Sequence, residues 1–566
     1  MHTLRVLIFL TILLVSFPAF GKELINSNIE SLNIQLVLPV RPSGRIQHIA
    51  DLFKRQVMSR CEEAEIKPGT PPVRIELNVE EGIGKEGFRI ADGSNGGVSI
   101  TGNDENGLLY GVGKFLRTSY YSKDGFTPGM WRGTSIPASP VRGIYLATHF
   151  NNFYEAAPPE EVVRYLEELS LWGLNTFTVH FPTWQYKDFN DSGAVVWLRN
   201  IKSLFHFAHQ AGLQVGLIQA PNQGFNTTPD ELRGVQVPGN RRGNFGVNLC
   251  VSKSGSRKLL TELYDHLLNE FKDVGLDYFI FWPYDEGGCA CKDCWPWGGR
   301  GFIEISKTIE PLVKRYFPAC KRVLSAWCFE NEDDNNPDGE WVGLARALNE
   351  DKSWVDYIMA DGHDYYFPKY LLEKGVPGNL PLLNFPEISM WGKYPWGGFG
   401  ATPLPEHFQI LWNMVKGKVA GGTAYSKGIF EDINKVIYSQ FYWDPERNVE
   451  ETVREYIAYE YTSGVIDEVM SVIRILEQNH QKRNLVTAEQ ALEIIKRVDA
   501  MLPAHVRTSW RWRILYLRTV IDRELCQPDG EAKTKALKTA FDELETIYHT
   551  NAGTLPSVRP PRAGKF

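Results

Sequence analysis

The chain has 566 residues, which is too long for one hydrophobic core and predicts two to four domains. Its 43% hydrophobic and 23% charged residues, without any low-complexity tract, exclude an intrinsically disordered or fibrous protein. The net charge is −7 and no basic stretch interleaves with aromatics, which argues against nucleic acid as a partner. Aromatic residues reach 12%, including 16 Trp, the side chain on which sugar rings commonly stack.

Residues 1–21 predict a cleaved export signal. Arg5 precedes an apolar run over residues 6–20, and the segment closes on the small-x-small pattern Ala19-Phe20-Gly21. The run is short for a membrane span and lacks a stop-transfer pattern. We therefore expect an exported protein, periplasmic or secreted, that starts at Lys22 and has no membrane contact after cleavage.

Residues 22–137 predict a small α/β accessory domain. Apolar alternation predicts strands over residues 73–79, 87–90 and 98–102, and a helix follows over 106–116. This part of the chain has no cluster of titratable groups, which indicates a supporting role. The stretch Pro137-Ala138-Ser139-Pro140 predicts its end.

Residues 138–445 alternate between strand and helix patterns. The predicted strands cover residues 142–147, 174–180, 214–219, 276–282, 322–327, 355–360, 380–385 and 418–424. Eight strands with helical crossovers in about 300 residues match the count and length of a (β/α)8 TIM barrel. A doubly wound open sheet is the competing architecture, but no glycine-rich phosphate fingerprint follows an early strand.

Residues 446–566 predict a C-terminal helical domain. Residues 449–461, 465–478 and 488–502 carry the 3.6-residue apolar period of helices packed on one face. The predicted fold class is therefore α/β, with a TIM barrel between a small N-terminal α/β domain and a helical C-terminal domain.

The end of the fourth predicted barrel strand carries the most informative chemistry. Its apolar run stops at Trp282, and Asp285 and Glu286 follow, with glycines after them. Barrel enzymes hold their catalytic groups at the carboxyl ends of strands. A carboxylic acid beside aromatic walls keeps its proton near neutral pH and can protonate a leaving oxygen, as glycoside hydrolases require. We predict Glu286 as the general acid; alternatively, Asp285 caps a turn and Glu286 is a solvated surface acid.

The other predicted strand ends carry carboxylates, amides and aromatics, a combination suited to sugar recognition. The candidate catalytic residues are Glu286, Asp285, Asp361, Asp364 and Glu387, and Glu431 follows the last strand. The candidate substrate contacts are Arg142, His149, Asn152, His180, Trp184, Trp282, Trp327, Tyr365, Trp391 and Tyr425. Structural alternatives remain, namely that the histidines hold the fold by hydrogen bonds and that the two aspartates around Gly362 form a turn.

Three routes of hydrolysis stay open. In an inverting enzyme the two carboxyl groups lie about 6.5–9.5 Å apart, and in a retaining enzyme about 5–5.5 Å apart. In the third, the N-acetyl oxygen of the substrate attacks and Asp285 orients the amide.

We predict no cofactor and no catalytic metal. His149, His180 and the acids lack the tight ligand spacing of a metal site, and no Gly-x-Ser-x-Gly elbow is present. The group Cys289, Cys291 and Cys294 is a weak candidate for a structural zinc site, with Cys250 or Cys328 as fourth ligand. The alternative is a disulfide with spare thiols packed under the loop.

The sequence resembles carbohydrate-active barrels that carry a small α/β domain in front, namely family 67 α-glucuronidases and family 20 β-N-acetylhexosaminidases. The segment 102–111 is similar to the end of that accessory domain in both families. Arg142 and His149-Phe150-Asn151-Asn152 resemble the first-strand arginine and the His-Trp-Asp-Asn region of the α-glucuronidases.

In the α-glucuronidases a Ser-Glu-Gly segment holds the acid, and Asp285-Glu286-Gly287 is similar to it. That resemblance implies a base at Asp361 or Asp364, and at Glu387. The hexosaminidases place Gly-Gly-Asp-Glu after the fourth strand, where the aspartate positions the N-acetyl group; here Trp-Pro-Tyr precedes the acidic pair instead. The cysteine group is similar to a Cys-x-Cys-x-x-Cys that follows the acidic motif of uncharacterised bacterial barrels.

These observations predict a glycoside hydrolase that removes a terminal uronic acid or N-acetylhexosamine from a polysaccharide or glycan. A uronate pocket needs a fixed cation, for which Arg142, Lys393 and Lys427 are the candidates. The alternative from another class is a non-catalytic carbohydrate-binding protein on a degenerate barrel, which would keep the aromatic platforms without turnover.

Overall fold

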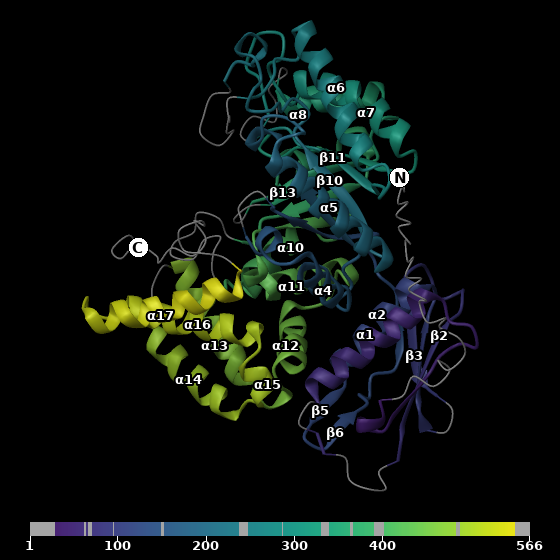
Figure 1. Cartoon of the computed structure of the whole chain (residues 1–566), viewed down its shortest axis with the longest axis vertical. Helices are drawn as coiled ribbons and strands as arrows, with labels where there is room; N and C mark the ends of the chain where they lie inside the picture. The colour runs from purple at the N-terminus through teal and green to yellow at the C-terminus, as the bar shows by residue number, and fades with distance from the viewer. Residues whose placement is uncertain are drawn as a thin grey trace, which may run out of the picture.

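The computed structural model describes most of the chain. The described residues are 29–61, 64–65, 71–93, 96–148, 152–236, 247–285, 287–329, 339–362, 366–389, 401–482 and 487–549. Within them a closed barrel stands above two other parts, a small sheet with its helices and a group of C-terminal helices (Figure 1).

The first part is a five-stranded sheet whose strand order is β1-β2-β4-β3-β7. Its strands are β1 (Ile34–Val37), β2 (Val73–Val79), β4 (Val98–Gly102), β3 (Phe88–Asp92) and β7 (Gly133–Ser135). Strands β1, β2 and β4 run parallel, and β3 is antiparallel to β4 and β7. The flanking elements are η1 (Glu30–Leu32), α1 (Gly44–Arg60), α2 (Glu105–Thr118) and a hairpin of β5 (Tyr120–Ser122) and β6 (Gly125–Thr127).

Helix α2 joins this sheet to the barrel. Asp104 caps its first turn by accepting a hydrogen bond from the Gly107 amide at 2.8 Å, as N-terminal caps commonly do. Two glycines allow close approach on opposite sides: a Cβ at Gly111 would lie 3.0 Å from Phe88, and one at Gly113 would lie 2.1 Å from the Leu171 carbonyl oxygen. A side chain at either position would therefore push the helix off its neighbours.

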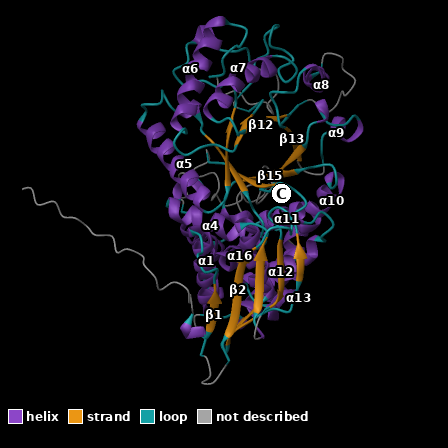
Figure 2. Ribbon diagram, turned by 90° about the vertical axis from the view of Figure 1, so that its right-hand side faces the viewer, coloured by secondary structure: helices purple, strands orange, loops and turns teal. Residues whose placement is uncertain are grey.

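The second part is the closed barrel, which confirms the predicted fold class. Eight parallel strands follow one another in chain order, and β15 pairs with β8 to close the ring. They are β8 (Val141–Leu146), β9 (Thr176–His180), β10 (Gln214–Gln219), β11 (Tyr278–Phe281), β12 (Lys321–Ser325), β13 (Tyr357–Gly362), β14 (Leu382–Pro386) and β15 (Gly421–Ser426). Figure 2 shows β12, β13 and β15 above the first sheet.

Helices surround the barrel and connect its strands. They are α3 (Phe153–Ala156), α4 (Pro159–Ser170), α5 (Ser192–Gln210), α6 (Ser254–Glu270), α7 (Gly301–Tyr316), α8 (Glu340–Glu350), α9 (Lys369–Glu373), α10 (Pro405–Val415) and α11 (Asp432–Trp443). Short 3-10 turns are η3 (Thr183–Gln185), η4 (Asp230–Leu232), η5 (Pro377–Asn379) and η6 (Ile429–Glu431). Strands β8, β9 and β11 are buried at every residue, as expected for parallel strands covered on both faces.

The third part consists of the C-terminal helices, drawn in green to yellow in Figure 1. They are α12 (Val449–Glu460), α13 (Ile466–Lys482), α14 (Ala488–Met501), α15 (Ala504–Arg507), α16 (Trp510–Leu525) and α17 (Glu531–Ile547), with η7 (Ser463–Val465) before α13. The helical prediction for this region is confirmed, whereas the domain boundaries at 137 and 445 stay predictions. Among the helices that the structure describes, none combines the length and apolar character needed to cross a membrane.

Arg142 fixes the barrel to the first part, and its predicted contact with substrate is wrong. It is the second residue of β8 and therefore lies at the amino end of the barrel, opposite the ends that hold ligands. Its guanidinium is fully buried and donates hydrogen bonds to a Glu86 carboxylate oxygen at 2.8 Å and to the Ser139 and Gly173 carbonyls at 2.8 and 2.7 Å. All of its observed bonds are structural.

We expect Arg142→Met to destabilise the protein by about 3–5 kcal/mol, because it leaves the Glu86 carboxylate without its buried partner. The matched control is Arg89→Met, which breaks a pair with Glu80 at 3.5 Å between two exposed side chains and should change stability by less than about 1 kcal/mol. Urea unfolding followed by tryptophan fluorescence measures both. Equal midpoints for the two variants would contradict the structural role.

Candidate active site

Charged side chains gather at the carboxyl ends of neighbouring barrel strands. Asp361 lies on β13 level with Phe385 of β14, and Glu387, one residue beyond β14, pairs with Tyr425 of β15. Asp285 follows β11 and acts electrostatically on Tyr425 and on Lys427, which follows β15. Strands distant in sequence therefore place carboxylates and a cation in one region, as the strand-end pattern predicts.

A cluster of aromatic rings, here called the aromatic floor, lies in the barrel interior beside these groups. The rings of Trp282 and Trp327 stack with centroids 5.1 Å apart, and Trp282 lies 5.0 Å from the ring of Phe385. Tyr145 and Tyr425 continue the floor, with centroids 5.5 Å apart and each less than 6 Å from that of Phe385. Rings packed in this way exclude water, which strengthens the interactions between the charges beside them.

Lys427 is the cation of this region. Its side chain is buried, and its Nζ lies 5.8 Å from the centroid of the Tyr425 ring. Burial lowers the pKa of Lys427 to about 7, against the opposing effects of Glu387, Glu431 and Asp285. Lys427 therefore interacts with three carboxyl groups, and its pKa lies near neutral pH.

Glu431 lies behind Lys427 and is fixed in the protein. Its carboxylate accepts hydrogen bonds from the Lys427 amide at 2.8 Å and from the Ser426 hydroxyl, and Lys435 Nζ is 3.7 Å away. Burial raises the pKa of Glu431 to about 7 in spite of Lys435. Glu431 and Lys435 thus form a buried ion pair next to the backbone of Lys427.

Glu387 is oriented by its own loop. One of its carboxylate oxygens accepts hydrogen bonds from the backbone amide of Ser389 at 2.8 Å and from the Ser389 hydroxyl. The side chain is 7% exposed. A carboxylate fixed by two donors and placed beside an aromatic floor is equipped to act on a bound sugar as base or nucleophile.

The loop that carries the acidic pair is clamped on both sides. Asp285 has a positive φ of 67°, which turns the chain sharply after β11. The Asn222 side chain then accepts from the Gly288 amide at 3.0 Å and donates to the Leu249 and Gly288 carbonyls at 2.9 and 3.1 Å. Before the turn, Trp297 Nε1 donates to the Pro283 carbonyl. The residues on either side of Glu286 are therefore held in place.

His180 ends β9 and is neutral near pH 7. Its Nδ1 lies 2.9 Å from the Ile218 carbonyl oxygen, which can only accept, so Nδ1 carries the proton and Nε2 the lone pair. Burial lowers the pKa of His180 to about 4, although the Asp285 carboxylate opposes this effect. His180 is thus a neutral ring on which Asp285 acts electrostatically.

This shift predicts a stability change with pH. The folded pKa is depressed below the ordinary value of 6.5, so the unfolded chain binds a proton first and stability is lost as the pH falls from about 6.5 to about 4. At pH 4 we expect His180 to have lowered the free energy of unfolding by roughly 3 kcal/mol relative to pH 7. His180→Gln should therefore make the free energy of unfolding depend less on pH over this range. The control His206→Gln replaces an exposed ring of α5 and should leave the curve unchanged. Urea unfolding at several pH values between 4 and 7 measures the difference, and identical slopes for both variants would contradict it.

Asn152 and Trp184, two further predicted substrate contacts, follow β8 and β9. Asn152 is 3% exposed and is engaged by the protein, since it donates to the Ala147 carbonyl at 2.8 Å and accepts from the Tyr154 amide at 3.1 Å as the cap of α3. These bonds give Asn152 a structural role, and its contact with a sugar stays a prediction. Trp184 lies half-buried in η3 after β9.

Several predicted residues lie outside the described residues. They are Glu286, His149, Asp364, Tyr365, Trp391 and Lys393. Conversely, Tyr145, Phe385 and Ser389 contribute to the region and were not among the predicted site residues. Tyr145 and Phe385 fall inside strands, where counting which alternate side chains point into the barrel would have found them.

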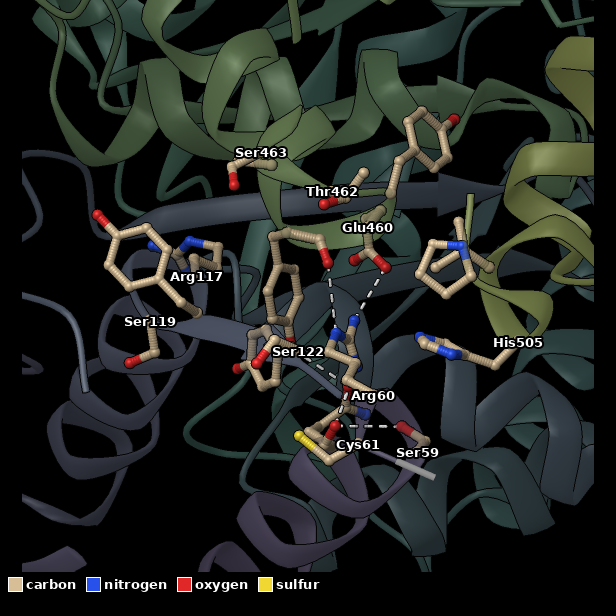
Figure 3. A pocket seen from close by; sticks show the side chains of 18 of the residues that line it. Ser59, Arg60, Cys61, Arg117, Ser119, Ser122, Glu460, Thr462, Ser463 and His505 are labelled. Carbon is tan, nitrogen blue, oxygen red and sulfur yellow. Dashed lines mark hydrogen bonds and ion pairs between the residues drawn. The ribbon is translucent and has the colours of Figure 1, made fainter. Parts of the chain in front are cut away.

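A cavity of about 1290 Å³ opens elsewhere, between the first part and the C-terminal helices. Figure 3 shows Arg60 of α1 directed at Glu460 of α12, with an N–O distance of 3.0 Å. Two further ion pairs lie near this cavity, between Arg117 and Glu455 at 2.9 Å and between Arg511 and Glu168 at 2.8 Å. Within the described chain, none of the candidate site residues lines this cavity, and its charges hold the three parts of the molecule together.

Comparisons with known proteins show the fold. No protein-family model matches the chain, and no curated protein matches it significantly. A family 115 4-O-methyl-α-glucuronidase with specificity for decorated arabinogalactans is similar with a TM-score of 0.60 at 12% identity, over 92% of this chain and 79% of that one. A family 89 protein from Clostridium perfringens, in complex with its substrate GlcNAc-α-1,4-galactose, is similar with a TM-score of 0.59 at 12% identity, over 89% of this chain and 64% of that one. A family 20 β-N-acetylglucosaminidase is similar with a TM-score of 0.52 at 12% identity, over 75% of this chain and 92% of that one. The resemblance to carbohydrate-active barrels is thereby confirmed for the fold.

Proposed function

We propose that the chain is an exported glycoside hydrolase that removes a terminal uronic acid from a glycan, with Glu286 as general acid. The observation that carries the proposal is the group of carboxylates that interact with Lys427, beside an aromatic floor at the carboxyl end of a barrel. The similar solved structures, which include a 4-O-methyl-α-glucuronidase, support the class of reaction.

The residues divide the chemistry between them. Glu286 protonates the leaving oxygen, beside a loop that Asn222 clamps. Glu387 is the second carboxylate, because Ser389 orients it and it lies level with Tyr425. Asp361 is its rival from β13. The sugar ring stacks on the aromatic floor, which Trp327 and Tyr425 leave partly exposed.

A uronic acid is favoured because a suitable cation is present. Of the three candidates, Arg142 lies at the amino end and Lys393 lies outside the described residues, whereas Lys427 is among the site carboxylates. A uronate carboxylate would replace part of the interaction that Lys427 now makes with its acidic neighbours. The export signal predicted over residues 1–21 supports action on glycans outside the cytoplasm.

The test is sugar release from a mixed panel by the full chain. The panel contains aryl glucuronides, glucuronic-acid-decorated xylo-oligosaccharides, 4-O-methylglucuronate-decorated arabinogalactan and aryl N-acetylhexosaminides. We expect free uronic acid from at least one uronide and no release of N-acetylhexosamine. Release of N-acetylhexosamine alone would keep the hydrolase and overturn the uronate assignment. Binding of the glycans without any turnover would overturn the hydrolase in favour of a carbohydrate-binding protein.

A further inference from the structure

Four cysteines converge beside the acidic loop. Cys250 follows the third barrel strand and precedes α6, whereas Cys289, Cys291 and Cys294 follow β11. Their four sulfur atoms all lie within 4.8 Å of one another. Cys250, Cys289 and Cys294 are buried and Cys291 is half-buried, so the group is closed to solvent on most sides.

The distances fit four thiolates around one metal ion. A tetrahedral zinc with Zn–S bonds of about 2.3 Å places its sulfurs about 3.8 Å apart. Cys250 Sγ lies 3.6 Å from Cys291 Sγ and 3.9 Å from Cys294 Sγ. A disulfide would join only two of the four sulfurs at about 2 Å and leave two thiols without a function.

The surroundings of the sulfurs form a cradle. The Cys289 sulfur accepts hydrogen bonds from the backbone amides of Cys291 and Val235, and the Ser252 hydroxyl lies 3.0 Å from Cys250 Sγ. Such donors stabilise and orient metal-bound thiolates. A Cβ at Gly234 would lie 3.2 Å from Cys289 Sγ, and one at Gly301 would lie 3.0 Å from the Cys294 Cβ. Only glycine allows the chain to pass so close to the cluster at these two positions.

We propose that Cys250, Cys289, Cys291 and Cys294 bind one structural zinc ion. Thiolates in a tetrahedral set favour zinc, and four protein ligands leave no open position for catalysis. Cys328, the other predicted fourth ligand, is not part of the converging group. The assignment is independent of the proposed hydrolase function.

The zinc would fasten the acidic loop to the segment before α6. Asn222 already bridges the same two segments, since it contacts the Leu249 carbonyl next to Cys250 and both backbone groups of Gly288 next to Cys289. The ion adds a second link directly after Asp285-Glu286-Gly287. Loss of the metal should therefore loosen the loop that carries the predicted acid.

The test is the metal content of the full chain, purified without chelator and measured by plasma mass spectrometry. We expect about one zinc per chain, released when a mercurial blocks the thiols and detected with a chromogenic zinc indicator. Cys250→Ser and Cys294→Ser should each retain less than about a tenth of the zinc. Cys320→Ser, which changes a buried thiol outside the group, is the matched control and should retain it all.

The wild-type measurements decide the proposal even where a variant does not fold. Removal of the metal with a strong chelator should lower the Tm, because an ion bound only by the folded state stabilises it. Iron in place of zinc would overturn the zinc assignment. A protein free of metal, whether mass spectrometry finds a disulfide within the group or four free thiols, would overturn the site altogether. None of these readouts depends on sugar turnover.

Discussion

Glu286→Gln lowers kcat/KM for a uronide with a poor leaving group by about 10²–10⁴-fold, the usual contribution of a positioned general acid. Glutamine keeps the size and polarity of the side chain but cannot deliver a proton to the departing oxygen. The flanking clamp on Gly288 by Asn222 should persist, so the variant should fold as the wild type does. Steady-state kinetics on decorated oligosaccharides measures the loss.

The leaving group identifies the role of Glu286. An aryl glucuronide that releases an acidic phenol needs little protonation, so Glu286→Gln should impair its hydrolysis far less. Glu262→Gln, which changes a mostly exposed side chain of α6, is the control and should leave both substrates unaffected. An equal loss on both substrates would show that Glu286 is not the acid, and no loss on either would make it a surface residue.

The barrel was predictable because its strands are short apolar runs at regular spacing. All eight predicted strands overlap the observed ones, and the boundaries differ by a few residues where polar ends such as Lys321 still pair in the sheet. The strand order follows from the barrel itself, in which consecutive parallel strands lie side by side. Local pattern and tertiary structure therefore agree over this part of the chain.

The site was predictable only in part, because a sequence shows where a strand ends but not where each side chain points. Arg142 lies on a barrel strand, yet its position near the start of β8 directs it to Glu86 in the first part of the molecule. Tyr145 and Phe385 looked like strand core and are indeed core, but they also form the floor of the site. The sequence left Cys250 and Cys328 open as the fourth member of the cysteine group, and the structure selects Cys250, which follows β10 next to β11.

Lys427→Met weakens the binding of free glucuronic acid at pH 6 by about 10–100-fold, the range expected for one charge-assisted hydrogen bond. Burial lowers the pKa of Lys427 to about 7, so the wild-type affinity should fall as the pH rises through about 7, by up to about tenfold per unit. Lys427→Arg stays protonated over this range, so its affinity should change less with pH than that of the wild type, and the change that remains is due to Glu431, whose pKa burial raises to about 7. Isothermal titration calorimetry between pH 6 and pH 9 measures all three proteins, and this prediction depends on the proposed uronate specificity.

Lys435→Met is the matched control for the loss of a buried ammonium group. Lys435 is buried to the same degree and lies 3.7 Å from the shared neighbour Glu431, but its hydrogen bonds go to Tyr165 and the Gly428 carbonyl rather than toward the site. Its loss should lower the Tm while the affinity for glucuronic acid is retained. A wild-type affinity that stays constant from pH 6 to pH 9, or equal affinities for the two methionine variants, would mean that Lys427 only balances the charge of its acidic neighbours. The sugar carboxylate, if one is bound, would then be recognised by another cation.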